Sequence, residues 1–188
     1  SLRSKIFSFL ISSKKKYKFN KKKFKSTHQV KKYNDFVNAS LSTNFSAGKL
    51  ELNNNLSLPK NNSRPIVGIN PGAAYGSSKQ WMPSEFAKVA IELASSYDII
   101  IFGGKDEELI SNDIESVLKK NNVHNYQNLA GRTSISELVK NISSLSFFIT
   151  GDSGPMHIAA SFQIPTVSIF GPTRDQETSQ WKNAKSVI

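Results

Sequence analysis

The segment GDSGPMHIAA, residues 151–160, combines a helix start with side chains that can bind a sugar phosphate. Pro155 suits the first position of a helix, which places Ser153 and Gly154 about its N-terminus. Free N–H groups and the helix dipole form an anion site there. Ser153 and His157 can donate hydrogen bonds to a phosphate, whereas Asp152 suits sugar hydroxyls. In the alternative interpretation, Asp152 and Ser153 only cap the helix and His157 is a packed surface residue. For this combination of residues, that interpretation ranks second.

A second candidate loop, NPGAAYGSSKQW, covers residues 70–81 and joins small residues to one lysine. Its glycines and alanines let backbone N–H groups approach an anion closely. Lys79 can place a point charge beside a phosphate. The loop is not a Walker A motif, which needs Gly-Lys-Ser/Thr leading into the helix. Taken alone, it is more typical of an ordinary strand-to-helix loop.

Two further loops are compatible both with a purely structural role and with ligand binding. GGKDEE, residues 103–108, ends a strand and opens a helix. Its acids either complement the helix dipole or contact a ribose, as in dinucleotide-binding folds. AGRTS, residues 130–134, is either a loop with a helix cap or a stretch of backbone that binds a base edge.

Other chemistry has little support. The absence of cysteine excludes a disulfide framework, a thiolate zinc site and a cysteine nucleophile. His28, His124 and His157 are scattered without metal-ligand spacing, so we expect no metal site. Neither a G-x-S-x-G elbow nor a G-x-G-x-x-G fingerprint occurs.

From Arg64 onward, apolar strands alternate with amphipathic helices. We expect strands at 65–70, 98–104, within 124–131, and at 146–152 and 166–171, with helices at 83–95, 107–120, 135–142 and 155–162. This alternation predicts an α/β fold, a Rossmann-like parallel sheet with helices on both faces. In such sheets ligands bind outside the carboxyl ends of the strands, where all the candidate loops lie.

Residues 1–62 differ from residues 63–188, which we expect to form the Rossmann-like nucleotide-sugar domain. The first region is rich in lysine, serine and asparagine, and we expect helices at 1–13 and 28–40 and a short strand at 14–19. Val30, Tyr33 and Val37 share one helix face. Residues 53–64 are polar and contain Pro59, which indicates a linker.

The net charge of +11 is unevenly distributed. Residues 1–50 hold 13 of the 25 Lys and Arg and one acid, Asp35, giving +12; the rest holds 12 bases and 13 acids, giving −1. The basic region indicates an anionic partner, unless it is a solvated tail or reflects lysine-biased composition. No apolar run reaches the roughly 18 residues of a membrane-spanning helix. Because no initiator methionine is present, we expect the chain to begin inside a larger protein.

Five segments between about Asn70 and Trp181 together carry a family resemblance: NPGAAYGSSKQWMPSEFA, IIIFGGKDE, NLAGRTSISEL, ITGDSGPMHIAA and VSIFGPT followed by TSQW. In order and spacing they resemble the C-terminal domain of bacterial heptosyltransferases, glycosyltransferase family 9, most closely the type II members. The upstream SLRSKIFSFLISSKKKYKF and HQVKKY are similar to the end of the family's N-terminal domain.

The resemblance implies the GT-B architecture, two Rossmann-like domains that face a cleft. The C-terminal domain would bind ADP-heptose and the N-terminal domain the anionic inner core of lipopolysaccharide. The implied reaction is an inverting, metal-independent transfer of L-glycero-D-manno-heptose, with ADP-heptose as donor substrate and no cofactor. The implied location is the cytoplasm, with peripheral contact at the inner-membrane surface.

The resemblance also implies a set of donor contacts. They are Ala74, Tyr75 and Lys79 at the diphosphate, Asp106 or its neighbour Glu107 at the adenosine ribose, Gly131 to Thr133 at the adenine, and Asp152, Ser153, Gly154 and His157 around the sugar and phosphates. Lys79 would neutralise charge on the departing ADP.

The chain departs from the family pattern at both ends. The family's catalytic aspartate, in a loop near the start of the N-terminal domain, has no counterpart here, and the family continues beyond Ile188. We therefore expect donor binding without transfer. The alternatives are another GT-B nucleotide-sugar enzyme, against which GDSGPMH and TSQW argue, and a basic nucleic-acid-binding module. The first 50 residues contain no motif such as RNP1, so we expect no nucleic-acid partner.

Overall fold

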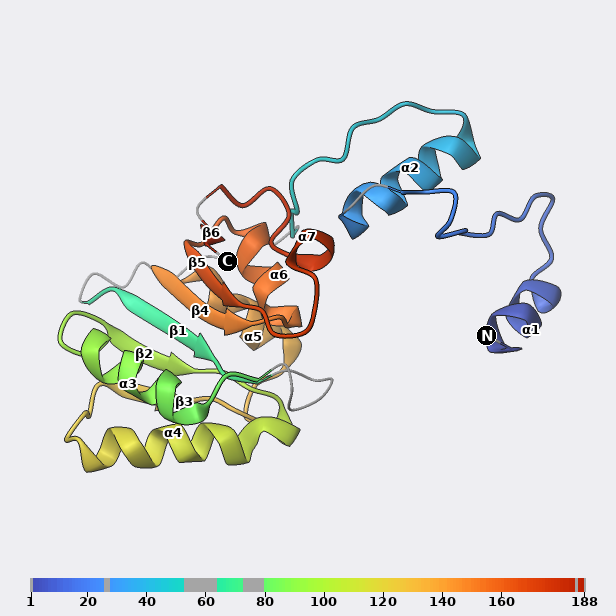
Figure 1. The fold of residues 1–188 in the computed structure, drawn as a ribbon. Coiled ribbons are helices and arrows are strands. Elements are labelled where there is room, and N and C mark those ends of the chain that lie inside the picture. The colour runs from blue at the N-terminus through green and yellow to red at the C-terminus, as the bar shows by residue number, and fades with distance from the viewer. Residues whose placement is uncertain (1, 26–27, 53–63, 73–79, 185, 188) are drawn as a thin grey trace. The chain divides into compact units, whose positions relative to one another are not determined.

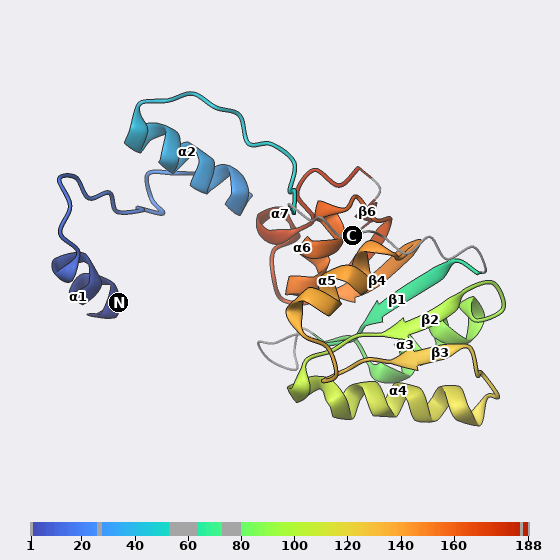
Figure 2. The ribbon, with the colours of Figure 1, turned by 180° about the vertical axis from the view of Figure 1, so that it is seen from behind.

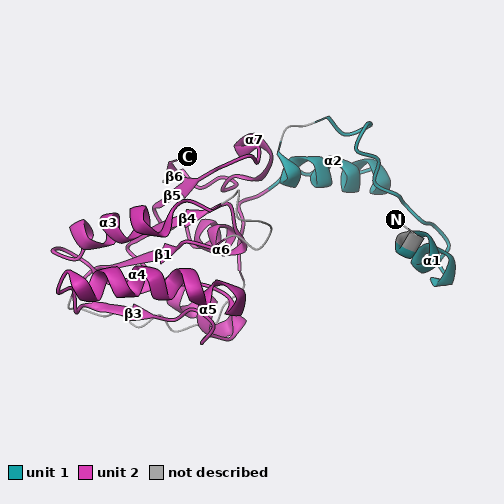
Figure 3. Cartoon of the chain, turned by 60° about the horizontal axis from the view of Figure 1, so that its bottom comes forward, with its two compact units in different colours: residues 1–47 teal, residues 48–188 magenta. Residues whose placement is uncertain are grey.

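The computed structural model describes residues 2–25, 28–52, 64–72, 80–184 and 186–187. The chain divides into two compact units, Ser1–Ala47 and Gly48–Ile188 (Figure 3). The domain boundary expected at residue 62, and the expected linker apart from Arg64, lie outside the described residues.

The first unit contains α1 (Leu2–Leu10) and α2 (Gln29–Leu41), which confirms both expected helices. At the start of α2, the Nδ1 atom of His28 accepts a hydrogen bond from the N–H of Val30 at 3.2 Å. The chain leaves α2 through Ser42, which has left-handed backbone angles.

The strand expected at residues 14–19 is wrong, because these residues form no strand. A strand is stabilised by backbone hydrogen bonds to a neighbour, and no described strand pairs with this segment. Phe19 instead packs among aromatic rings, with centroids 5.0 Å from Tyr33, 5.5 Å from Phe36 and 5.7 Å from Phe24. This small aromatic cluster attaches the segment to α2.

The second unit is built on a six-stranded parallel sheet with the order β3-β2-β1-β4-β5-β6 (Figures 1 and 2). Its elements in chain order are β1 (Ile66–Asn70), α3 (Pro83–Leu93), β2 (Asp98–Ile101), the 3₁₀ helix η2 (Lys105–Glu107), α4 (Glu108–Lys120), β3 (Tyr126–Asn128), α5 (Ile135–Ser143), β4 (Phe147–Gly151), α6 (Gly154–Ser161), β5 (Thr166–Ile169), α7 (Asp175–Thr178) and β6 (Ser186–Val187). The predicted parallel α/β fold is confirmed.

The two faces of the sheet are covered by different helix pairs, α3 with α4 and α5 with α6 (Figures 1 and 2). Successive residues of a strand point to opposite faces. Ile99 and Ile101 accordingly belong to the core beneath α3 and α4, whereas Ile100 and Phe102 belong to the core beneath α5 and α6. Burial on both faces explains why these strands read as continuous apolar runs.

Gly68, in the middle of β1, leaves space for two large rings in the second core. A Cβ atom at this position would lie 2.5–2.9 Å from side-chain atoms of Leu145, Phe148 and Phe102. The rings of Phe102 and Phe148 meet edge to face, with centroids 5.9 Å apart. The absent side chain of Gly68 therefore allows this pair to pack against the central strand.

The start of α5 follows local chemistry, whereas two short elements near the C-terminus were not expected. The hydroxyl of Ser134 accepts the N–H of Glu137, and the Glu137 carboxylate accepts the N–H of Ser134 at 2.8 Å, which caps α5. The unexpected elements, α7 and β6, have 4 and 2 residues, too few to show a hydrophobic period. Within the described part of the chain, no helix is both long and apolar enough to cross a membrane.

Candidate functional site

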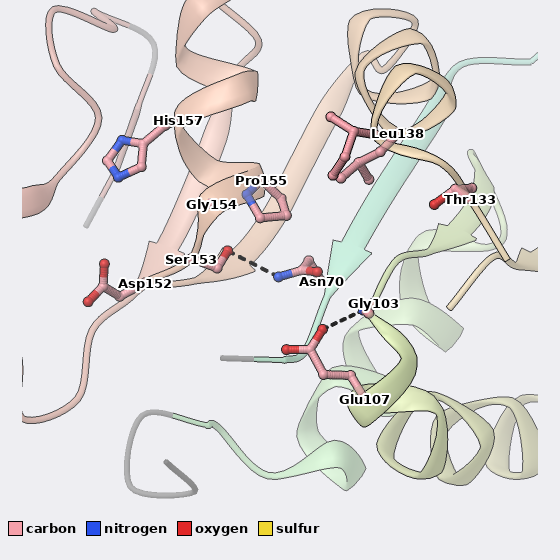
Figure 4. Close-up of a pocket in the computed structure, with 12 residues that line it drawn as sticks. Asn70, Gly103, Glu107, Thr133, Leu138, Asp152, Ser153, Gly154, Pro155 and His157 are labelled. Carbon is pink, nitrogen blue, oxygen red and sulfur yellow. Dashed lines mark hydrogen bonds between the residues drawn. The ribbon is translucent and has the colours of Figure 1, made fainter. Parts of the chain in front are cut away.

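A cavity of about 440 Å³ lies at the carboxyl ends of β1 and β4, where the strand order reverses. Connections from these two strands run to opposite faces of the sheet, which opens a crevice between their loops. The residues that line it are Asn70, Gly103, Gly104, Glu107, Thr133, Ile135, Leu138, Asp152, Ser153, Gly154, Pro155 and His157 (Figure 4).

The N-terminus of α6 forms one side of the cavity. Gly154 and Pro155 open the helix, and Ser153 precedes it in an extended conformation, with φ −148° and ψ 166°. The Ser153 side chain makes no capping hydrogen bond to this helix. The first N–H groups of a helix lack partners within the helix, so this end can receive an anion.

A buried polar network joins the ends of β1 and β4. The Nδ2 atom of Asn70 donates to the hydroxyl of Ser153 at 3.1 Å (Figure 4) and to the hydroxyl of Thr150 at 3.2 Å. The two hydroxyl oxygens lie 3.0 Å apart. Asn70 is 2% exposed and Thr150 is fully buried, so both depend on this network to satisfy their polar groups. The network fixes the loop after β4 against the last residue of β1.

Glu107 forms the opposite side of the cavity, at the end of η2. Its Oε2 atom accepts a hydrogen bond from the N–H of Gly104 at 2.7 Å. The same carboxylate lies against Gly72, where a Cβ atom would overlap it. Both contacts hold the carboxylate at the cavity wall, where an ionised group can accept hydrogen bonds from hydroxyls of a ligand.

An apolar wall follows the end of β3. Ile135 and Leu138, from α5, line the cavity beside Thr133 and the backbone of Gly103. Ile135 is 75% exposed, so its side chain presents an apolar surface at the cavity. A flat apolar ring suits such a wall.

Gly131 connects two of the strand-end loops. Its N–H donates to the carbonyl of Gly103 at 2.9 Å, and its φ of 69° lies in the left-handed region that favours glycine. A Cβ atom there would overlap the carboxylate of Glu108. Gly131 thus holds the loop after β3 against the loop after β2 without lining the cavity itself.

The structure brings together six of the residues expected at the donor: Glu107, Thr133, Asp152, Ser153, Gly154 and His157. Asp106 is exposed and, like Gly131, is not part of the described lining. Ala74, Tyr75 and Lys79 lie outside the described residues.

Comparison with known proteins decides the family. The sequence model of glycosyltransferase family 9 (heptosyltransferase) matches residues 7–188. The chain belongs to this family. Lipooligosaccharide heptosyltransferase 2 of Campylobacter jejuni is 43% identical over 98% of this chain. The alignment covers 59% of that relative, so the chain spans little more than half its length.

Solved family structures share the fold. The structure of E. coli ADP-heptose lipopolysaccharide heptosyltransferase II matches 68% of this chain and 38% of its own, with a TM-score of 0.63 and 30% identity. A second E. coli heptosyltransferase, solved with ADP, matches 92% of this chain and 52% of its own, with a TM-score of 0.70 and 17% identity. The sheet therefore has the Rossmann-like fold of these solved heptosyltransferase structures.

In this family 9 chain, the cavity is also lined by residues that were not among the expected donor contacts: Asn70, Gly103, Gly104, Ile135, Leu138 and Pro155. One of them carried a usable signal. Asn70 is a polar residue that ends an otherwise apolar strand, directly before a glycine-containing loop. Ile135 and Leu138 in α5 carried no such signal, because their spacing is that of any amphipathic helix.

Proposed function

We propose that this chain supplies the donor site of a heptosyltransferase of type II. The whole protein would transfer heptose from ADP-heptose to the lipopolysaccharide inner core by an inverting, metal-independent reaction. The observation that carries the proposal is the cavity at the β1–β4 reversal, which combines a helix N-terminus, a held carboxylate and an apolar wall. The solved relative that is 30% identical is named for ADP-heptose.

Each part of ADP-heptose suits one part of the cavity. Adenine would lie against Ile135 and Leu138, and Glu107 would accept hydrogen bonds from the ribose hydroxyls. The diphosphate would lie at the start of α6, with Ser153 as a further donor. Asp152 suits the heptose hydroxyls as an acceptor.

The proposed chemistry of this half concerns the leaving group. Negative charge develops on the diphosphate as its bond to the sugar breaks. Helix N–H groups and hydroxyl donors that are already in place stabilise that charge without reorganisation. Lys79 would add a positive charge. In this proposal, a carboxylate of the N-terminal domain takes the proton of the attacking hydroxyl.

The basic region at residues 1–50 suits the acceptor. Residues 1–50 carry a net charge of +12, and the inner core is anionic. We therefore propose that this region contributes to acceptor binding at the cytoplasmic face of the inner membrane.

Titration calorimetry on the 188-residue chain tests the donor site. We expect ADP to bind more tightly than UDP, and Lys79→Ala to weaken ADP binding. Equal affinity for ADP and UDP would favour another GT-B nucleotide-sugar enzyme. Tight, strongly salt-dependent binding of a DNA duplex in place of ADP would favour a nucleic-acid-binding module.

A further inference from the structure

Asn70 is a buried amide at the cavity wall for which the proposed function has no role so far. It ends β1 and lies within reach of three acceptors. The Nδ2 atom is 3.1 Å from Ser153 Oγ, 3.2 Å from Thr150 Oγ1 and 3.4 Å from the carbonyl oxygen of Gly72. A carbonyl oxygen can only accept, so its position requires the nitrogen of Asn70, and not the oxygen, to face this group.

The protons of the cluster can be assigned in the same way. The Thr150 hydroxyl lies 3.0 Å from the carbonyl oxygen of Gly151, which must accept, so Thr150 donates its one proton there. Thr150 Oγ1 then has only lone pairs to offer Asn70 and Ser153. The two protons on Asn70 Nδ2 point toward the two hydroxyl oxygens, at 3.1 Å and 3.2 Å, and the more distant Gly72 carbonyl, at 3.4 Å, shares one of them. Of the two hydroxyl protons in the cluster, the Thr150 proton is taken by a carbonyl and the Ser153 proton is not.

We propose that Asn70 is a positioning residue that keeps the Ser153 hydroxyl a hydrogen-bond donor toward the diphosphate, an inference that rests on the proposed function. Without a bound phosphate, the Ser153 hydroxyl donates its proton to Thr150 Oγ1. When a phosphate arrives, this proton turns outward. Asn70 still donates to both hydroxyl oxygens, so no buried group loses its only partner.

Replacing Asn70 by aspartate leaves the shape of the side chain almost unchanged but reverses the direction of its hydrogen bonds to the two hydroxyls. The ionised carboxylate in Asn70→Asp would have only acceptors where the amide has two N–H groups. Ser153 would then donate inward, and the ligand would lose a donor and face a nearby negative charge. Protonation of the introduced carboxyl restores one inward donor. The ADP affinity of this variant should therefore recover at low pH.

Titration calorimetry with ADP on the 188-residue chain, at about pH 7.5 and about pH 5, measures the change in affinity. These two pH values are chosen because burial raises the pKa of an introduced carboxyl toward the range between them. At the higher pH we expect Asn70→Asp to bind ADP about tenfold more weakly than the unsubstituted chain. The ratio of the two dissociation constants, that of the variant over that of the unsubstituted chain, should fall at the lower pH. Glu107, Asp152 and His157 line the same cavity and are the same in both proteins, as is the added ADP. The ratio of affinities removes their contribution.

A second pair of variants separates positioning from general damage. If Asn70 acts through Ser153, then Asn70→Asp in a Ser153→Ala background should add little loss and no pH dependence. Asn70→Ala and Ser153→Ala, which introduce no charge, should likewise have non-additive effects on ADP affinity. Thermal unfolding of each variant confirms that it is folded, and the alanine pair decides the question if Asn70→Asp does not fold.

The possible results distinguish failure of this inference from failure of the proposed function. If the unsubstituted chain binds ADP and either Asn70→Asp binds equally well at both pH values or the alanine effects are additive, the inference is overturned and the proposed function stands. If the unsubstituted chain binds no ADP, the proposed function is overturned and the inference with it. A pH-dependent loss that Ser153→Ala abolishes supports both.

Discussion

Gly72, just after β1, lies directly against the carboxylate of Glu107 at the end of η2. The same carboxylate accepts the N–H of Gly104 at 2.7 Å. The carboxylate is thus held between two loops that follow neighbouring strands, β1 and β2. A residue 35 positions away in the sequence therefore depends on Gly72 for its place at the cavity wall.

Gly72→Ala should weaken ADP binding by displacing this carboxylate. The added Cβ atom needs the space that Glu107 occupies, so one of the two groups must move. We expect a loss of about tenfold in affinity, measured by calorimetry. Gly48→Ala is the matched control, because a Cβ atom there meets nothing within 4 Å. Equal losses in both variants would contradict the role given to Gly72.

Glu107→Gln should weaken ADP binding, whereas Asp106→Asn should not. Glu107 lines the cavity and Asp106 is exposed outside the described lining. An amide is a weaker acceptor than a carboxylate for ribose hydroxyls, and the expected loss is about tenfold. A larger effect from Asp106→Asn would assign the ribose to the other acid.

Gly68→Ala should destabilise the second unit without altering any residue at the cavity. The methyl group would overlap Leu145, Phe148 and Phe102, and such overpacking costs about 1–3 kcal/mol. The free energy of unfolding, from urea titration followed by circular dichroism, measures this cost. Gly48→Ala again serves as the control. Unchanged stability in Gly68→Ala would mean that the aromatic pair can move aside.

Glu115→Gln should lower stability at neutral pH, and the difference should shrink in acid. Hydrogen bonds from Lys119, at 2.7 Å, and from Asn128, at 2.8 Å, lower the pKa of the Glu115 carboxyl below its ordinary value of 4.5. A carboxyl whose pKa is lower in the folded state stabilises the fold above its unfolded pKa. That contribution is lost as the pH falls through the folded pKa.

Thermal unfolding of both proteins between about pH 7 and pH 3 tests this prediction, since the window follows from the lowered pKa. We expect the two melting temperatures to converge below about pH 4.5. Glu85→Gln is the control, because the pair of Glu85 with Lys88 is an i,i+3 surface contact, a type that contributes little. A constant difference across the range would show that packing, and not charge, makes Glu115 stabilising.

Much of the fold could be predicted from the sequence, because its signals are local. Continuous apolar strands and amphipathic helices indicated the parallel sheet, and Ser134 with Glu137 marked the start of α5. The strand expected at 14–19 was wrong because a strand depends on a partner that its own residues do not specify. Residues 73–79, which include three of the expected donor contacts, lie outside the described part of the chain, so those contacts remain predictions.

The sequence by itself determined the family and the set of strand-end loops from which a site could be built. Only the tertiary structure separated Asp106 from Glu107, because it places the Glu107 carboxylate against Gly72 at the cavity wall and leaves Asp106 exposed. Only the tertiary structure joined Asn70 to Ser153, which lie 83 positions apart. Local patterns specify where a strand ends, but the pairing of β1 with β4 decides which strand ends become neighbours.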